Sequence, residues 1–63
     1  METNSRKLLR LLERDGWQIA RTRGDHVILK HPSIAELITM PHLKKDLPKG
    51  LVRRIYTLAG WQP

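Results

Sequence analysis

Apolar residues near the N-terminus recur with the period of a helix. Leu8, Leu9, Leu11 and Leu12 stand at i, i+1, i+3 and i+4, which places them on one helical face. Asn4 or Ser5 can cap the first turn, because their side-chain oxygens accept from free backbone N–H groups. The pattern predicts a helix from this cap to about Asp15. Gly16 then ends the helix, since glycine adopts a positive φ at little cost.

The pattern changes to alternation after Gly16. Residues 17–22 predict a first strand, with Trp17 and Ile19 on one face. Residues 23–25 predict a tight turn through Gly24 and Asp25. A second strand over residues 26–31 places Val27 and Leu29 on one face, and two short strands joined by so tight a turn predict a hairpin.

Two proline-containing segments divide the rest of the chain. Pro32 and Ser33 end the second strand, residues 36–40 predict a third, and Pro41 closes it. Residues 42–50 are polar and basic and predict a loop. A second helix is expected to start between Asp46 and Pro48, with Asp46 as a possible N-cap, and to end at Gly60. Its expected apolar stripe consists of Leu51, Ile55, Leu58 and Ala59, with Val52 at the edge. Trp61 is expected to fold back as a lid on the core.

The predicted order is α-β-β-β-α in one domain of residues 1–63. Short connections favour a three-stranded antiparallel sheet with both helices on one face, an α+β fold. This is the topology of double-stranded-RNA-binding domains, although a fold does not determine a function.

Charge narrows the possible partners. The chain has 12 Lys and Arg residues against 6 acidic residues, a net charge of +6. Such a bias favours nucleic acid, an acidic protein or an anionic membrane surface. The chain has no cysteine, no apolar run of transmembrane length and a polar N-terminus, so we expect a soluble protein of the cytoplasm.

The candidate chemistry centres on one histidine. His26 and His31 are five residues apart, so on one strand they face opposite ways and cannot share a metal ion. There are no paired carboxylates, no HExxH motif and no glycine-rich phosphate loop, so we expect neither a metal nor another cofactor. Proton transfer on RNA by His26 is then one reading, since RNA carries its own nucleophile in the 2′-OH. A solvated turn residue is the other, and the residues alone leave both open.

Basic residues in two places could contact RNA. Arg21, Arg23 and Lys30 are close to His26 in sequence, and Lys44, Lys45 and Lys49 cluster around the start of the second helix. Lysines and a helix N-terminus attract phosphate without reading sequence. A solvated basic surface is the alternative for both groups.

Several short motifs, in this order and spacing, resemble the HicA toxin family, also called YcfA-like mRNA interferases. The resemblance covers residues 6–60. The motifs are Asp15-Gly16-Trp17, Arg21-x-x-Gly24-x-His26, Lys30-His31-Pro32, Pro41-His42, Lys44-Lys45-Asp46-Leu47-Pro48-Lys49-Gly50, and Ile55 with Ala59-Gly60.

This resemblance implies a double-stranded-RNA-binding-like fold and metal-independent endoribonuclease activity on mRNA, with His26 as the catalytic acid or base. It also implies a HicB-type antitoxin that covers the active face in a hetero-oligomer. Three positions depart from the usual family residues: Asp25 replaces serine, Val27 replaces a second histidine and Leu29 replaces an aromatic residue. Asp25 places a negative charge beside His26, which either strengthens the histidine's proton affinity or orients its ring, and which also opposes the approach of RNA.

Two other functions stay open on the sequence. One is a module that coats double-stranded RNA without cutting it. The other is a structural or regulatory subunit whose basic face docks an acidic partner.

Overall fold

The computed structural model describes residues 1–62. Its first element is α1 (Ser5–Arg14), and Asn4 is the N-cap, as predicted. The Asn4 side chain accepts from the backbone N–H of Lys7 at 3.2 Å. Asp15 caps the other end, and Gly16 follows with φ +100°. The helix therefore begins and ends at the residues that the sequence indicates.

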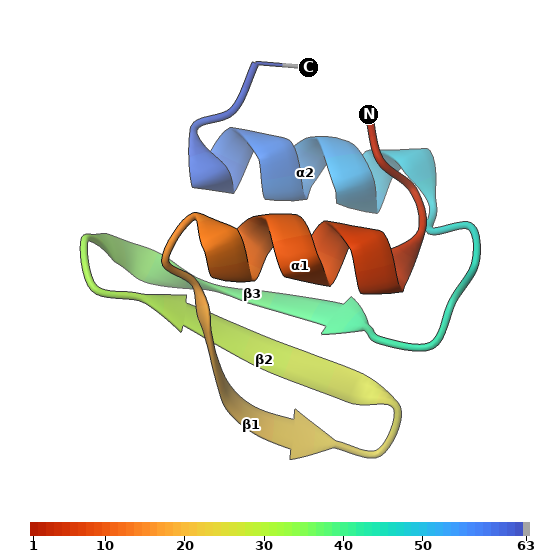
Figure 1. The fold of residues 1–63 in the computed structure, drawn as a ribbon, viewed down its shortest axis with the longest axis horizontal. Coiled ribbons are helices and arrows are strands. Elements are labelled where there is room, and N and C mark those ends of the chain that lie inside the picture. The colour runs from red at the N-terminus through yellow and green to blue at the C-terminus, as the bar shows by residue number, and fades with distance from the viewer. Residues whose placement is uncertain (63) are drawn as a thin grey trace.

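Three strands form one antiparallel sheet in the order β1-β2-β3 (Figure 1). They are β1 (Gln18–Arg23), β2 (His26–His31) and β3 (Ile34–Pro41). The two hairpins close through residues 24–25 and 32–33. β3 begins two residues earlier than the alternation indicates, so little chain is left between it and β2.

Both helices cover the same face of this sheet, as predicted, and they run side by side in the same direction (Figure 1). α2 spans Lys49–Ala59. Val27 and Leu29 of β2, together with Ile38 and Met40 of β3, are buried with apolar residues of the helices. The helical members of this core are Leu8, Leu12, Val52 and Ile55. The α-β-β-β-α fold of the double-stranded-RNA-binding class is confirmed.

The first strand lies outside this core. All six residues of β1 are exposed, and β1 forms the edge of the sheet away from the helices (Figure 1). Trp17 and Ile19, which the alternation places together, differ in environment: Trp17 is 1% exposed and Ile19 is 43% exposed. Trp17 precedes the strand and belongs to the buried core cluster that includes Leu8 and Leu12 of α1. Ile19 lies beside a break in the pairing register with β2. The two helices form too narrow a layer to cover β1 as well as β2 and β3.

The start of α2 differs from the prediction. Pro48, not Asp46, occupies the N-cap, and no side chain bonds to the first turn. Leu47, assigned above to a polar loop, is 2% exposed and belongs to the core. Val52 is fully buried at the centre of the helix's apolar face rather than at its edge, and Leu51 is only half-buried. Docking against β3 sets this rotation of the helix.

The N-terminal segment ties α1 to the loop that precedes α2. Ser5 is fully buried. Its N–H donates to the Lys44 carbonyl at 2.9 Å, and its Oγ accepts from the Lys44 N–H at 2.8 Å. The Leu47 N–H donates to the Thr3 carbonyl at 2.8 Å. Residues about forty positions apart are thus held together by three hydrogen bonds.

His31 joins α1 to the β2–β3 turn. Its Nδ1 accepts from the Ser33 N–H at 3.0 Å, so the ring proton lies on Nε2. Nε2 then donates to the Asp15 carbonyl at 3.0 Å. The ring also packs edge-on against Trp17, with 5.2 Å between centroids. His31 is therefore a structural residue at the opposite end of β2 from His26.

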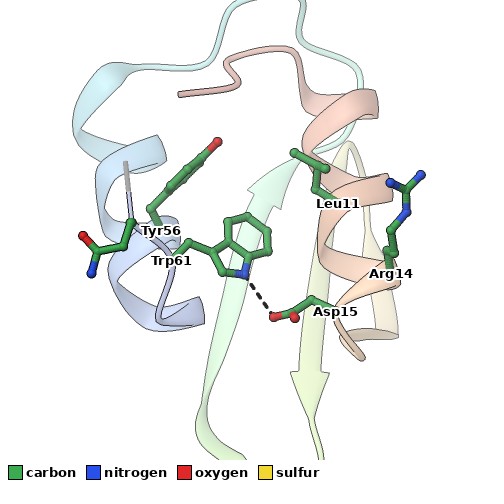
Figure 2. Close-up of a pocket in the computed structure, with 6 residues that line it drawn as sticks. Leu11, Arg14, Asp15, Tyr56 and Trp61 are labelled. Carbon is green, nitrogen blue, oxygen red and sulfur yellow. Dashed lines mark hydrogen bonds between the residues drawn. The ribbon is translucent and has the colours of Figure 1, made fainter.

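Trp61 folds back on the core, as predicted. Trp61 is partly buried against the core and donates from Nε1 to Asp15 Oδ2 at 3.0 Å (Figure 2). Its ring meets Tyr56 edge-on at 5.1 Å. Within residues 1–62, no helix has the length and hydrophobicity needed to cross a membrane.

Candidate nucleic-acid interface

The turn that carries His26 is fixed at both sides. Gly24 opens it with φ +58°, a conformation that favours glycine. In the pairing register, His26 lies opposite Arg23 on β1 and opposite Pro41 on β3. The Asp25 carbonyl accepts from the His42 N–H at 3.0 Å, which fastens the turn to the end of β3. The histidine is thus displayed from a rigid corner of the sheet.

Asp25 determines which nitrogen of His26 is free. Asp25 Oδ1 lies 2.9 Å from His26 Nδ1. An ionised carboxylate only accepts hydrogen bonds, so Nδ1 carries a proton. The neutral ring then has its unprotonated nitrogen at Nε2, the atom that can take a proton from a substrate. The His26 side chain is 47% exposed, so a substrate can reach it.

The same contact acts on the carboxylate. The hydrogen bond from His26 lowers the pKa of Asp25 below its ordinary value, and a backbone hydrogen bond and the charges of His26 and His42 act in the same direction. Asp25 therefore stays ionised at neutral pH and keeps its role as an acceptor. Of the two effects on His26 that the sequence suggested for Asp25, the structure shows that it orients the ring.

A hollow of about 370 Å³ opens beside His26. Its lining consists of Asp25, His26, Pro41, Leu43 and Lys44. Lys44 brings a cation to the hollow from the loop after β3. The hollow therefore combines a proton acceptor and a positive charge, which are the groups that phosphodiester chemistry requires.

The three cations near His26 in sequence are not equally near in space. Arg23, opposite His26 in the register, and Arg21, opposite Ile28, lie on the sheet face away from the helices. Lys30 is on this face too, but it is four residues along β2, roughly 13 Å from His26 at the rise of a strand. The structure brings Arg23 next to His26 and leaves Lys30 at the far end of the strand.

The second predicted cluster also divides. Lys44 reaches the hollow beside His26, whereas Lys45 lines a neighbouring hollow with residues of α1. Lys49 is the first residue of α2 and is exposed. Gly50 has nothing within 4 Å of an added Cβ, so no part of the protein approaches it closely. Crowding within the chain therefore does not explain the glycine.

A separate hollow of about 320 Å³ lies at the opposite end of α1 (Figure 2). Its residues are Leu11, Arg14, Asp15, Tyr56, Trp61 and Gln62. It is mostly apolar, and its one carboxylate is already bonded to the Trp61 indole. It contains no histidine, so the hollow at His26 is the better candidate for chemistry. Among residues 1–62, no three His, Asp or Glu side chains come together as a metal site would require.

Sequence reasoning missed two parts of this site. Pro41 and Leu43 line the hollow but carry no catalytic signature, and Leu43 stands out only as an apolar residue in a basic loop. The backbone contact from His42 to Asp25 joins the residue after β3 to the turn between β1 and β2. Neither could be read from spacing along the chain, because strand pairing creates both.

Comparisons with known proteins agree with this fold. A family model described as "HicA toxin of bacterial toxin-antitoxin" matches residues 5–61. A solved structure described as "HicA3 and HicB3 toxin-antitoxin complex" contains a chain that is 38% identical. The match covers 90% of this chain and 92% of that chain, with a TM-score of 0.79. No curated protein was found to match.

Proposed function

Since the chain belongs to the HicA family of bacterial toxin–antitoxin toxins, we propose that it is an endoribonuclease that cleaves mRNA with His26 as its catalytic acid or base. The observation that carries the proposal is the hydrogen bond between Asp25 and His26 Nδ1, which leaves Nε2 unprotonated in a residue that lines a hollow together with Lys44. In this proposal the protein acts as a toxin in the cytoplasm, where its target is mRNA.

The reaction uses groups that RNA and the hollow supply. His26 Nε2 takes the proton of a ribose 2′-OH, and the oxygen attacks the adjacent phosphorus. The bond from phosphorus to the 5′-oxygen breaks, that oxygen takes a proton from solvent as it leaves, and His26 releases the proton it accepted to solvent. The products are a 2′,3′-cyclic phosphate and a 5′-OH end, and no metal ion or oxidant takes part in this step.

Positive side chains around His26 would stabilise the charge that builds on phosphorus. Arg23 lies opposite His26 in the sheet, and Lys44 lines the hollow. Arg21 and Lys30 extend the basic surface along the sheet, and Lys45 and Lys49 extend it toward α2. Contacts of this kind hold the RNA backbone and carry no sequence information. We therefore assign affinity to these six residues and proton transfer to His26.

Incubation of the purified protein with RNA in EDTA tests this function. The wild type is expected to cleave, and His26→Ala is expected to lose the activity while circular dichroism shows an unchanged fold. Gln18→Ala is the matched control, since Gln18 is exposed on β1 opposite Lys30, at the far end of the hairpin. RNA with a 2′-O-methyl group at the cut site should resist the wild type. Intact RNA with a clear gel shift would instead establish the alternative, a double-stranded-RNA-binding module without catalysis.

Membership of the HicA family also supports an antitoxin partner. The matching solved structure is described as a complex of HicA3 with HicB3. We propose that a HicB-type antitoxin covers His26 in a hetero-oligomer, since a surface with net charge +6 attracts an acidic protein. Co-expression of a neighbouring antitoxin-like reading frame should restore growth. Cells that stay arrested although the two proteins co-purify would contradict occlusion of the site.

A further inference from the structure

The hollow beside His26 adjoins a second hollow, which is basic. This second hollow, of about 320 Å³, lies between the start of α1 and the loop after β3. Its lining residues are Asn4, Ser5, Arg6, Leu43, Lys44 and Lys45. Leu43 and Lys44 belong to both hollows, so the two adjoin along this loop. A chain-like ligand that fills the first can extend into the second.

The charges of the second hollow select an anion. Arg6, Lys44 and Lys45 are all exposed cations, and none of the six lining residues is acidic. Arg6 appears in the sequence only as one of three arginines spaced by four along α1, a pattern typical of a solvated face. The fold separates it from the others, because Arg10 and Arg14 do not line this hollow. Of these three arginines, only Arg6 lines the hollow together with Lys44 and Lys45.

The frame of this hollow is rigid. Ser5 is fully buried and holds both the N–H and the carbonyl of Lys44, at 2.8 and 2.9 Å. Arg6 directly follows Ser5, and Lys45 directly follows Lys44. The two backbone segments that display the cations are therefore fixed before any ligand binds, which lowers the entropy cost of binding.

Leu43 is the apolar side chain that lines both hollows. It is 72% exposed, the most exposed of the large apolar side chains in the described residues. An apolar side chain between two anion sites suits a ligand that is charged at intervals and apolar between the charges. Single-stranded RNA has this form, since its phosphates alternate with ribose and base. In RNA the covalent backbone imposes this alternation at every nucleotide, whereas in an acidic peptide it depends on the sequence.

From this arrangement we propose that the hollow of Arg6, Lys44 and Lys45 binds a second phosphate of the RNA strand, next to the one held at His26, with the intervening nucleoside packed on Leu43. This inference rests on the proposed function, because it extends the path of the same RNA. It adds Arg6 as a binding residue and fixes the direction in which the strand leaves His26.

The test is the salt dependence of binding to a short single-stranded RNA that carries 2′-O-methyl groups throughout and so cannot be cleaved. Each phosphate contact to a single strand contributes roughly 0.7 to the slope of log affinity against log salt. Arg6→Gln should lower that slope by about this amount. The loss of affinity that it causes should be roughly fivefold larger at ~0.05 M salt than at ~0.5 M salt. Arg10→Gln is the matched control, with the same charge change one turn further along α1, and should lower the slope less.

Two further variants keep the test valid if Arg6→Gln fails to fold. Lys45→Gln should reproduce the reduced slope, and Lys7→Gln, an exposed lysine of α1 outside both hollows, should not. Equal slopes for Arg6→Gln and Arg10→Gln would overturn the proposal, whatever happens to antitoxin binding. Because the RNA is not cleavable, this result is independent of catalysis: a wild type that fails to cut RNA rejects the nuclease, and equal slopes reject only the second phosphate site.

Discussion

The contact between Gly16 and His31 should make Gly16 the least replaceable of the glycines with positive φ. Gly16 has φ +100°, and a Cβ built there would lie 3.0 Å from His31 Nε2. That nitrogen donates to the Asp15 carbonyl, so a methyl group at Gly16 displaces the ring from its hydrogen bond. Gly16→Ala therefore combines backbone strain with the displacement of a packed, hydrogen-bonded side chain.

The free-energy cost of Gly16→Ala has two contributions, one from the backbone and one from His31. Placing alanine in the left-handed region costs about 1–2 kcal/mol. Loss of the His31 hydrogen bond adds about 1 kcal/mol. The total of about 2–3 kcal/mol corresponds to a fall in Tm of roughly 10–20 °C for so small a domain. Gly60→Ala is the control, since Gly60 has φ +78° and open space around it, and only the strain of about 1–2 kcal/mol applies there.

Urea unfolding followed by circular dichroism measures these differences, and a double-mutant cycle separates the two contributions. In a His31→Ala background the ring is absent, so Gly16→Ala should cost no more than Gly60→Ala. The reasoning is refuted if Gly16→Ala and Gly60→Ala are equally destabilising in the wild-type background. It is also refuted if removing His31 leaves the cost of Gly16→Ala unchanged.

Three other predictions follow from burial and hydrogen bonding. Val52→Ala should cost about 2 kcal/mol in urea unfolding, and more than Leu51→Ala, because Val52 is fully buried. Ser5→Ala should cost about 1–3 kcal/mol in the same assay, because it leaves the Lys44 N–H without its acceptor; an effect below ~0.5 kcal/mol would show that water replaces the hydroxyl. The pKa of Asp25 is lowered in the folded protein, so its contribution to stability is present above its ordinary value of 3.8 and is lost as the pH falls below it. Asp25→Asn should remove that part of the loss of stability at low pH. If the urea midpoints of the two proteins changed identically with pH, the contact between Asp25 and His26 would be contradicted.

Local chemistry in the sequence was enough to predict the order of elements and most of their ends. Asn4, Gly16 and Gly60 act through their own backbone and the nearest turn, so they mark helix ends without knowledge of the fold. The alternation of residues 26–31 correctly separated Val27 and Leu29 from His26 and Lys30. These signals depend on contacts within a few residues, which the sequence displays directly.

The start of α2 shows where such signals fail. Asp46 has the chemistry of an N-cap, but Leu47 is drawn into the core and its N–H is bonded to Thr3. The chain therefore reaches helical geometry only after Pro48. Burial of one leucine and a backbone bond from the opposite end of the chain outweigh a local preference that is worth about 1 kcal/mol.

For the candidate site, the sequence by itself determined the residue types: one histidine after a glycine turn, an acid beside it, and two groups of cations. The tertiary structure alone decided which of them meet. Strand pairing sets Arg23 beside His26 and leaves Lys30 roughly 13 Å away. The Ser5–Lys44 hydrogen bonds bring Arg6 to the lysines of a loop almost forty residues later. Proximity of this kind depends on the packing of distant segments, and no spacing along the chain records it.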